Sequence, residues 1–124
     1  MAGLTLDAGA LIAYERGEAR VREILAVAYA RGLVPTIPAV ALAEVWRGNA
    51  KDARVARLLK ACSLEALDER LARAAGRLRR TTPAASTIDA CIAAGVRQRM
   101  DAIATSDPDD MRRLLGPRFT ILTV

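Results

Sequence analysis

The sequence predicts an α/β fold in which helices cover both faces of a parallel sheet. Short apolar segments of strand length alternate with longer segments of helical periodicity, and this alternation favours parallel strands joined by helical crossovers. A length of 124 residues suits one domain, predicted to span residues 1–124. Hydrophobic residues make up 52% of the chain and aromatic residues only 3%, so the core must be aliphatic.

The N-terminal segment predicts one strand and two helices. Residues 3–7 form a short apolar strand that ends in an acid, and residues 8–14 form a short helix. Residues 18–31 predict a longer helix, because apolar side chains recur at helical spacing at Val21, Leu25, Ala28 and Tyr29. Gly32 is placed to end this helix as a C-cap.

A second strand and a third helix follow. Residues 33–36 predict the strand, in which Pro35 is tolerable only near the end. Residues 38–46 predict a helix that begins with a proline and is stopped by Gly48 and Asn49.

The middle of the chain predicts two helices around a weak strand. Residues 52–61 form the first helix, with Asp52 as its N-cap. Residues 63–66 form the strand, and residues 68–80 form the second helix. Residues 81–85 are the clearest break in the chain.

The last part of the chain completes the alternation. It predicts helix, strand, helix and strand over residues 87–100, 102–105, 107–115 and 119–124. The sequence contains no internal repeat, low-complexity stretch or linker.

Composition excludes some classes of protein and favours others. No apolar run approaches the roughly 20 residues of a membrane span, and no leader precedes the first strand, so we expect a cytoplasmic protein without a membrane partner. Cys62 and Cys91 lack CxxC spacing, which favours reduced, buried thiols. The net charge of +5, with 17 arginines among 19 basic residues, favours a polyanionic partner. A GC-rich genome would produce the same preference for arginine.

Four carboxylates mark a candidate site. Asp7, Glu44, Asp89 and Asp107 lie at strand ends or in largely apolar helical stretches. The chain has no histidine, and clustered carboxylates without histidine indicate a Mg²⁺ or Mn²⁺ site that acts on phosphate esters. Asp7 and Asp107 directly follow two strands, where ligands bind in open parallel sheets.

Three of these acids have a structural explanation as well. Asp7 is suited to cap the helix that follows it. Ser86 and Asp89 match a capping box. Asp107 precedes Pro108, the usual order of an N-cap and the first helical residue.

Two further explanations concern Glu44 and the acids after Asp107. Glu44 is the only charge in residues 37–46, so it either points at solvent from a narrow strip or has a cationic partner, for which a metal is plausible. Asp109 and Asp110 suit the positive end of the last helix. Asp110 is therefore a weaker candidate for the site than Asp107.

The ordered set of acids resembles that of the PIN-domain ribonucleases, and within them the VapC-type toxins of bacterial toxin–antitoxin pairs. Four segments carry the resemblance: Leu4-Thr5-Leu6-Asp7-Ala8-Gly9-Ala10-Leu11-Ile12-Ala13, Ala43-Glu44-Val45-Trp46-Arg47-Gly48, Thr87-Ile88-Asp89-Ala90, and Ala104-Thr105-Ser106-Asp107-Pro108-Asp109-Asp110. The likeness covers essentially the whole chain.

The resemblance implies a three-layer α/β/α fold with a four- to five-stranded parallel sheet. It also implies metal-dependent cleavage of single-stranded RNA by the four acids, as catalytic residues and metal ligands. We expect Asp7 and Asp107 to be the main ligands of Mg²⁺ or Mn²⁺, and Asp89 to bind directly or through water. Glu44 is expected to be a ligand or to accept a proton from the attacking water. Thr105 or Ser106 matches a hydroxyl position of the family.

The resemblance further implies a homodimer and a cognate antitoxin whose tail occupies the acidic cleft. We expect the apolar surface for the contacts with the second subunit and with the antitoxin to come from the early helices, around Leu25, Val45 and Trp46.

Three arginines are candidates to position the RNA. Arg47 lies three residues after Glu44, which places it on a neighbouring helical face one turn on. Arg79 and Arg80 adjoin the break at residues 81–85. The alternative for each is a solvated surface charge.

Other functions fit less well. A non-catalytic PIN-like dimerising or regulatory RNA-binding module is the main alternative. A haloacid-dehalogenase-type phosphatase requires Asp-x-Asp after the first strand, but residue 9 is glycine. A phosphorelay receiver requires paired acids at the same place, and the pair is missing.

Overall fold

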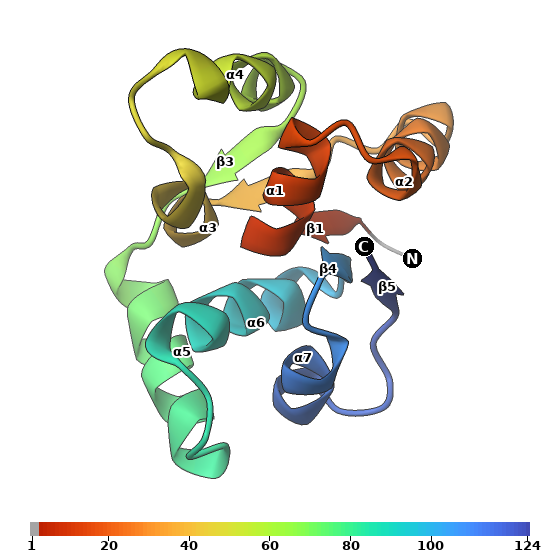
Figure 1. Cartoon of the computed structure of the whole chain (residues 1–124). Helices are drawn as coiled ribbons and strands as arrows, with labels where there is room; N and C mark the ends of the chain where they lie inside the picture. Colours follow the sequence, from red (N-terminus) through yellow and green to blue (C-terminus); the bar gives the residue numbers. More distant parts are fainter. Residues whose placement is uncertain (1–2) are drawn as a thin grey trace.

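A computed structural model describes residues 3–124 as a five-stranded parallel sheet between two layers of helices (Figure 1). The strands are β1 (Leu4–Leu6), β2 (Thr36–Pro38), β3 (Ser63–Glu65), β4 (Ala102–Thr105) and β5 (Ile121–Thr123). The helices are α1 (Ala8–Glu15), α2 (Ala19–Ala30), α3 (Ala39–Val45), α4 (Ala53–Lys60), α5 (Glu69–Thr81), α6 (Thr87–Arg99) and α7 (Pro108–Leu115), with a 3₁₀ turn, η1 (Ala50–Asp52). The predicted α/β class and parallel sheet are confirmed. The predicted domain includes Met1 and Ala2, which lie outside the described residues.

The strand order places the switch in connectivity at β1 and β4. The order is β3-β2-β1-β4-β5, so the chain builds outward from β1 to β3 and then returns to β4 on the other side of β1. Leu6 is in register with Ala104, and the Asp7 amide donates to the Ala104 carbonyl at 3.2 Å. The segments that leave these two strands therefore begin side by side, at the edge where open sheets bind ligands.

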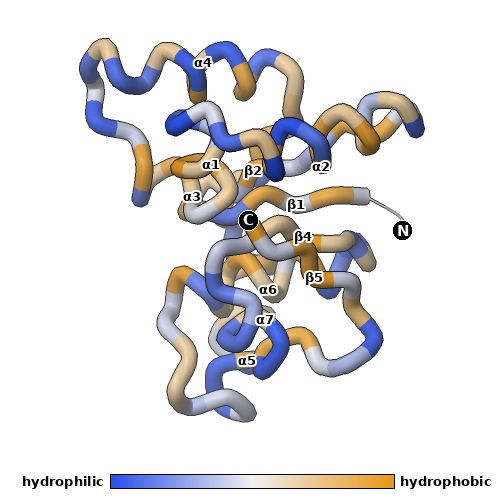
Figure 2. The backbone as a smooth tube through the Cα atoms, turned by 45° about the vertical axis from the view of Figure 1, so that its right-hand side comes forward, coloured by the Kyte–Doolittle hydropathy of each residue, from blue (hydrophilic) through white to orange (hydrophobic). Residues whose placement is uncertain are grey.

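The helices form two groups, one on each face of the sheet. Helices α1 to α4 cover one face of the sheet, and α5 to α7 cover the other (Figure 1). The main core lies on both faces, and its largest fully buried side chains include Leu4, Leu6, Leu11, Ile37, Ile92, Ile103 and Met111. Figure 2 shows hydrophobic residues along β1, β4 and β5, whereas hydrophilic residues recur along the outer helices α4 and α5.

A second apolar cluster holds α5 against α6. Its buried members are Leu71, Ala75, Ala90, Cys91 and Ala94. Both cysteines are free thiols, with Cys91 buried and Cys62 half-buried, and burial raises the pKa of each. None of the helices between residues 3 and 124 is long and apolar enough to cross a bilayer.

The prediction for the second strand was wrong in position. The strand was expected at residues 33–36, but β2 runs from Thr36 to Pro38 and α3 begins one residue later than expected. Ile37 is 0% exposed and Val34 is 62% exposed, so the residue that the core requires is Ile37. Pro38 has φ −64° and ψ 136°, extended values that let it end the strand and precede the helix.

The end of α2 agrees with the prediction except at one aromatic residue. Gly32 has φ +73° and follows the helix as a left-handed C-cap, as expected. Tyr29 was expected on the apolar face, but its side chain is 40% exposed. Its hydroxyl donates to the Ala61 carbonyl at 3.2 Å, so it links α2 to the end of α4.

Asp52 occupies the N-cap position of α4, as the sequence predicted, but its side chain makes no capping hydrogen bond to this helix and instead organises the preceding loop. Its carboxylate accepts from the backbone N–H groups of Arg47 (3.1 Å), Gly48 (2.6 Å) and Asn49 (3.1 Å). The residue is only 3% exposed. Burial alone raises the pKa of Asp52, but these N–H groups outweigh it and hold the pKa below the ordinary value of 3.8.

We expect Asp52→Ala to lower the melting temperature at pH 7 by roughly 5 °C or more, because three backbone N–H groups of the loop lose their acceptor. A depressed pKa gives stability that is present above the unfolded-state pKa and is lost as the pH falls below it. The difference between wild type and variant should therefore shrink below pH 3.8. Thermal melts followed by circular dichroism across this range check both points. Equal melting at pH 7 would contradict the role given to Asp52.

Candidate functional site

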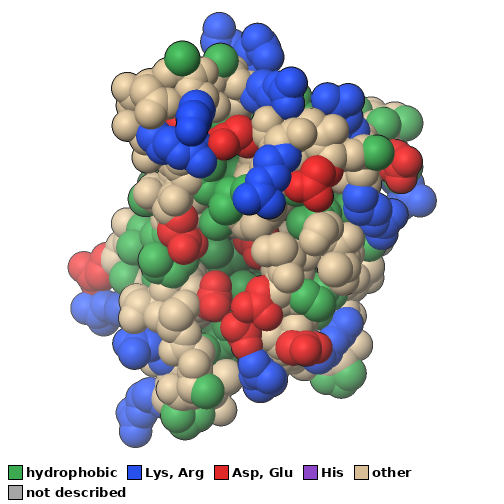
Figure 3. All heavy atoms as spheres, in the orientation of Figure 1, with side chains coloured by type: hydrophobic (Ala, Val, Ile, Leu, Met, Phe, Trp, Pro, Cys, Tyr) green, Lys and Arg blue, Asp and Glu red, His purple; other side chains and the backbone are tan. Residues whose placement is uncertain are grey.

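The four predicted acids lie on elements that meet at the carboxyl edge of the sheet, near enough for their charges to influence one another. Asp7 follows β1 and begins α1, and Asp107 lies two residues after β4. Glu44 lies in the last turn of α3, and Asp89 lies in the first turn of α6. Figure 3 shows Asp and Glu side chains gathered around a hollow at the centre of this face, with hydrophobic side chains at its floor. Four separate elements thus bring negative charge to one place.

Electrostatic effects show that these carboxylates influence one another, with Asp89 in the centre. Burial is the main cause that raises the pKa of Asp7 and Glu44, and the negative charge of Asp89 raises both further. Burial also raises the pKa of Asp89, and the Asp110 carboxylate adds to that increase. The charge of Asp89 contributes to the raised pKa of Asp107 as well.

Asp110 joins this group of acids. A hydrogen bond with the Asp110 carboxyl is the main cause that raises the pKa of Asp107. The same contact lowers the pKa of Asp110, which also pairs with Arg113. The weaker candidate of the sequence prediction therefore lies beside the stronger one. We refer to Asp7, Glu44, Asp89, Asp107 and Asp110 as the acidic cluster.

Asp7 differs from the other buried acids of the molecule. Asp7, Asp52 and Asp101 are 6%, 3% and 5% exposed. Asp52 accepts three backbone N–H groups, and Asp101 accepts from the Arg99 guanidinium at 2.9 Å. Among residues 3–124 Asp7 has no basic partner, although a buried carboxylate is costly without one.

Thr105 connects the two acids that follow β1 and β4. Its Oγ1 accepts from the Asp107 amide at 2.9 Å, and its side chain hydrogen-bonds to Asp7, which partly opposes the rise in the pKa of Asp7. Thr105 is 0% exposed, so the connection is shielded from water. The hydroxyl predicted from the sequence therefore positions both acids.

Gly9 is a residue of the site that the sequence analysis did not single out. A Cβ at this position would lie 2.0 Å from the Ser106 Oγ, 2.7 Å from the Ser106 Cβ and 3.0 Å from the Ser106 amide nitrogen. The first turn of α1 therefore packs directly on the loop that carries Asp107. A glycine two residues after a strand-end acid was the only signal for this approach.

The structural explanations for the acids are only partly confirmed. Asp7 caps α1, because its Oδ1 accepts from the Ala10 amide at 2.9 Å. Ser86 caps α6 by accepting from the Asp89 amide at 3.0 Å, which leaves the Asp89 carboxylate at the surface of the first turn. Asp107 occupies the N-cap position of α7, but its side chain makes no capping hydrogen bond. Capping therefore does not account for the carboxylates of Asp89 and Asp107.

The sequence also matches a protein-family model. The match is to the PIN domain, and it covers residues 4–115. The chain belongs to the PIN-domain family. No curated protein sequence matches it at a significant level.

Solved structures share the fold of this PIN domain at low sequence identity. A chain of the VapBC2 complex from Rickettsia felis, bound to a promoter DNA fragment, has a TM-score of 0.80 at 13% identity, with 98% of each chain covered. DNA-bound VapBC from Salmonella typhimurium gives 0.74 at 18% identity, with coverage of 99% of this chain and 98% of that one. A toxin–antitoxin complex from Klebsiella pneumoniae gives 0.72 at 18%, with coverage of 87% and 89%. These matches confirm a three-layer PIN-like fold.

The predicted substrate-binding arginines have different surroundings from those expected. The helix α3 ends at Val45, so Arg47 does not lie on it. Its guanidinium pairs with Glu15 at 2.8 Å and approaches Asp52 at 4.0 Å. Arg79 and Arg80 are exposed in the last turn of α5, beside the predicted break.

The predicted apolar partner surface is largely wrong. Leu25 and Val45 are 4% and 3% exposed and belong to the core. Trp46 alone is available, with 45% of its surface exposed. Helical spacing had correctly placed Leu25 on the apolar face of α2, and because that face packs into the core it is not available to a partner.

The donor chemistry of the acidic cluster fits a hard divalent cation. All its donors are carboxylate oxygens, the ligands that Mg²⁺ and Mn²⁺ prefer. Among residues 3–124, however, no three His, Cys, Asp or Glu side chains lie close enough to enclose an ion as they stand. Mutual repulsion of these like charges opposes such a closed arrangement.

The raised pKa values predict how stability depends on pH. A carboxyl whose folded-state pKa exceeds its unfolded value gives stability that is complete below the unfolded pKa and is lost as the pH rises through the folded pKa. With a chelator present, the melting temperature of the Asp89→Asn protein relative to that of wild type should therefore increase as the pH rises from about 4 to 7. Melts of both proteins across this range measure the difference. A difference that does not change with pH would contradict the mutual repulsion.

Proposed function

We propose that this PIN-domain protein is a Mg²⁺- or Mn²⁺-dependent endoribonuclease and the toxin of a VapBC-type toxin–antitoxin pair. The observation that carries the proposal is the burial of Asp7, which has no basic partner within residues 3–124 and lies inside a cluster of acids from four different elements. A cation is the group that would offset both the desolvation and the repulsion of these carboxylates.

Each acid has a proposed role. Asp7, Asp89 and Asp107 hold the cation, and Thr105 fixes the backbone of Asp107 and the side chain of Asp7. A bound Mg²⁺ or Mn²⁺ would neutralise the negative charge that develops on the phosphate and would lower the pKa of the attacking water molecule.

Glu44 is the proposed proton acceptor. The oxygen of a water molecule attacks phosphorus, the bond from phosphorus to the leaving sugar oxygen breaks, and the Glu44 carboxylate takes the proton of the water. Burial and the charge of Asp89 raise the pKa of Glu44, which brings it closer to the range suited to a general base.

RNA and protein partners are part of the proposal. The net charge of +5 supports an RNA substrate, positioned by Arg79, Arg80 and the hydroxyl of Ser106. Arg47 would contact phosphate only after its pairing with Glu15 is released. The similar folds of VapBC complexes support a cognate antitoxin, and we propose a homodimer as the active form.

The test is cleavage of a labelled RNA of mixed sequence by the purified full chain. We expect cleavage with Mg²⁺ or Mn²⁺ and none with a chelator. Induced expression in a bacterial host should stop growth, and Asp89→Asn should not. RNA that stays intact in every condition would support the alternative, a non-catalytic PIN-like module. That alternative is consistent with the absence of a closed three-residue metal cluster within residues 3–124.

A further inference from the structure

Helix α5 carries a row of arginines along one exposed face. Arg70, Arg73, Arg77 and Arg80 recur every three or four residues, which places them on the same side of the helix. At a rise of 1.5 Å per residue the row is roughly 15 Å long. The other side of α5 buries Leu71 and Ala75 against α6. We call these four residues the arginine stripe.

The positive charge of the arginine stripe is largely unpaired. Arg73 pairs with Glu69 at 2.9 Å, but the two side chains are 71% and 80% exposed, and such pairs are weak. Between residues 3 and 124 no carboxylate forms a salt bridge with the other three arginines of the stripe. Figure 3 shows Lys and Arg side chains over this part of the molecule, apart from the acidic cluster.

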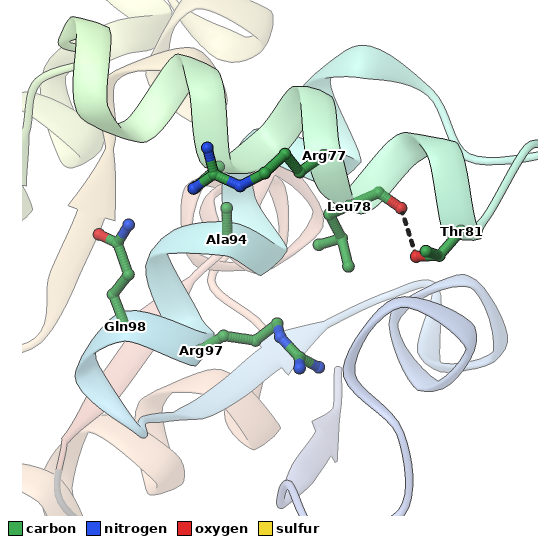
Figure 4. A pocket seen from close by; sticks show the side chains of 7 residues that line it. Arg77, Leu78, Thr81, Ala94, Arg97 and Gln98 are labelled. Carbon is green, nitrogen blue, oxygen red and sulfur yellow. Dashed lines mark hydrogen bonds between the residues drawn. The ribbon is translucent and has the colours of Figure 1, made fainter.

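The stripe borders a groove of about 440 Å³ between α5 and α6. The guanidinium of Arg77 lies over Ala94, whose small side chain leaves the floor open (Figure 4). Arg97 also lines the groove, but its guanidinium extends toward α7 and donates to the Leu115 carbonyl at 3.2 Å. Within the described part of the chain, residues 3–124, Arg77 is therefore the cation of the groove that is free to bind a ligand.

The acidic cluster creates a need for such a surface. The five carboxylates of the acidic cluster repel the phosphates of an RNA chain. Cations elsewhere along the surface that the RNA follows must therefore supply the attraction. The loop of residues 82–86 joins the end of α5 to the first turn of α6, which carries Asp89. One end of the stripe is thus connected by a short loop to the cluster. Self-association through the stripe is disfavoured, because a two-fold contact would place like charges together.

We propose that the arginine stripe binds the sugar–phosphate backbone of RNA outside the acidic cluster. This inference rests on the proposed nuclease function, which it extends from the cleaved bond to the flanking nucleotides. Guanidinium groups suit phosphate because they offer paired donors and a weakly hydrated charge. The row would follow several successive phosphates and would not read bases.

The experiment measures RNA binding without cleavage, in an Asp7→Asn background. The stripe variant carries Arg70→Gln, Arg73→Gln and Arg77→Gln, and it keeps Arg80, which the proposed function already assigns to the substrate. The control carries Arg22→Gln, Arg57→Gln and Arg118→Gln, the same change of charge at exposed positions of other elements. Fluorescence anisotropy reports the binding of a labelled single-stranded RNA of roughly 20 nucleotides.

The stripe variant should bind this RNA at least about tenfold more weakly than the control. The slope of log K against log salt should fall by about 2, since each lost phosphate contact removes about 0.7. Equal affinities of stripe variant and control would overturn the proposal. The assignment to RNA would be overturned if the protein bound duplex DNA of matched length more tightly than the RNA and if the stripe variant lost that DNA binding to the same extent.

A second measurement separates this proposal from the nuclease function. With Asp7 intact, the stripe variant should cleave a long RNA more slowly but should cleave a short oligonucleotide, which cannot reach the stripe, at the control rate. Equal loss on both substrates would contradict the proposal. If wild type cleaves neither substrate, the nuclease proposal fails, while the anisotropy comparison still decides whether the stripe binds RNA.

Discussion

Asp7→Asn is expected to lower kcat/KM for RNA cleavage more than about 100-fold while the protein keeps or gains melting temperature in a chelator. Asparagine caps helices as well as aspartate does, so the hydrogen bond from the Ala10 amide can be kept. The amide removes the buried charge that has no basic partner among residues 3–124. Cleavage of a labelled RNA and thermal melts of the same preparations measure both quantities.

The matched control for this prediction is Asp109→Asn. Asp109 is exposed in the first turn of α7 and lies outside the acidic cluster, so it makes the same change of charge close to the site. We expect it to keep activity within about twofold. Full activity of folded Asp7→Asn protein would remove the nuclease proposal, and a large loss in both variants would show only a general effect of charge.

Gly9→Ala is expected to destabilise the protein by about 1–3 kcal/mol and to lower kcat/KM by about tenfold or more. The new Cβ would lie 2.7 Å from the Ser106 Cβ and 3.0 Å from the Ser106 amide nitrogen, so backbone must move. That movement separates the start of α1 from the loop that carries Asp107. Urea unfolding and the cleavage assay measure the two effects.

A second substitution should rescue this variant. Ser106→Gly in the Gly9→Ala background removes the Cβ and Oγ that the new methyl group meets, and we expect most of the stability to return. Gly76→Ala in α5 is the control, because its Cβ would meet nothing within 4 Å. Gly76→Ala should add up to about 1 kcal/mol and leave activity unchanged. If Ser106→Gly gives no rescue, the close approach is not the cause.

Local patterns predicted most of the fold because they report on burial and caps. The alternation of strands and helices gave the parallel sheet, and Gly32 gave the end of α2 correctly. The second strand was misplaced because Val34 is apolar but 62% exposed, and because one proline precedes the true strand and another is its last residue. Which apolar residue enters the core depends on the neighbouring strands, and the local sequence does not contain them.

The acids of the site were predictable because of where they stand in the topology. Asp7 and Asp107 follow adjacent strands, and adjacent parallel strands end at one edge of the sheet. The partner of Arg47 was not predictable in the same way. Glu15 lies 32 residues earlier in the sequence, and only the packing of α1 beside the loop after α3 brings the two together.

The most direct test of the account is the binding of Mn²⁺ by the purified protein, measured by titration calorimetry. Wild type should bind the ion in a saturable manner, and Asp7→Asn and Asp107→Asn should each lose that binding, although the two residues are far apart in the sequence. Asp109→Asn should bind as wild type does. If wild type binds no Mn²⁺, or if both site variants bind it unchanged, the acidic cluster is not a metal centre.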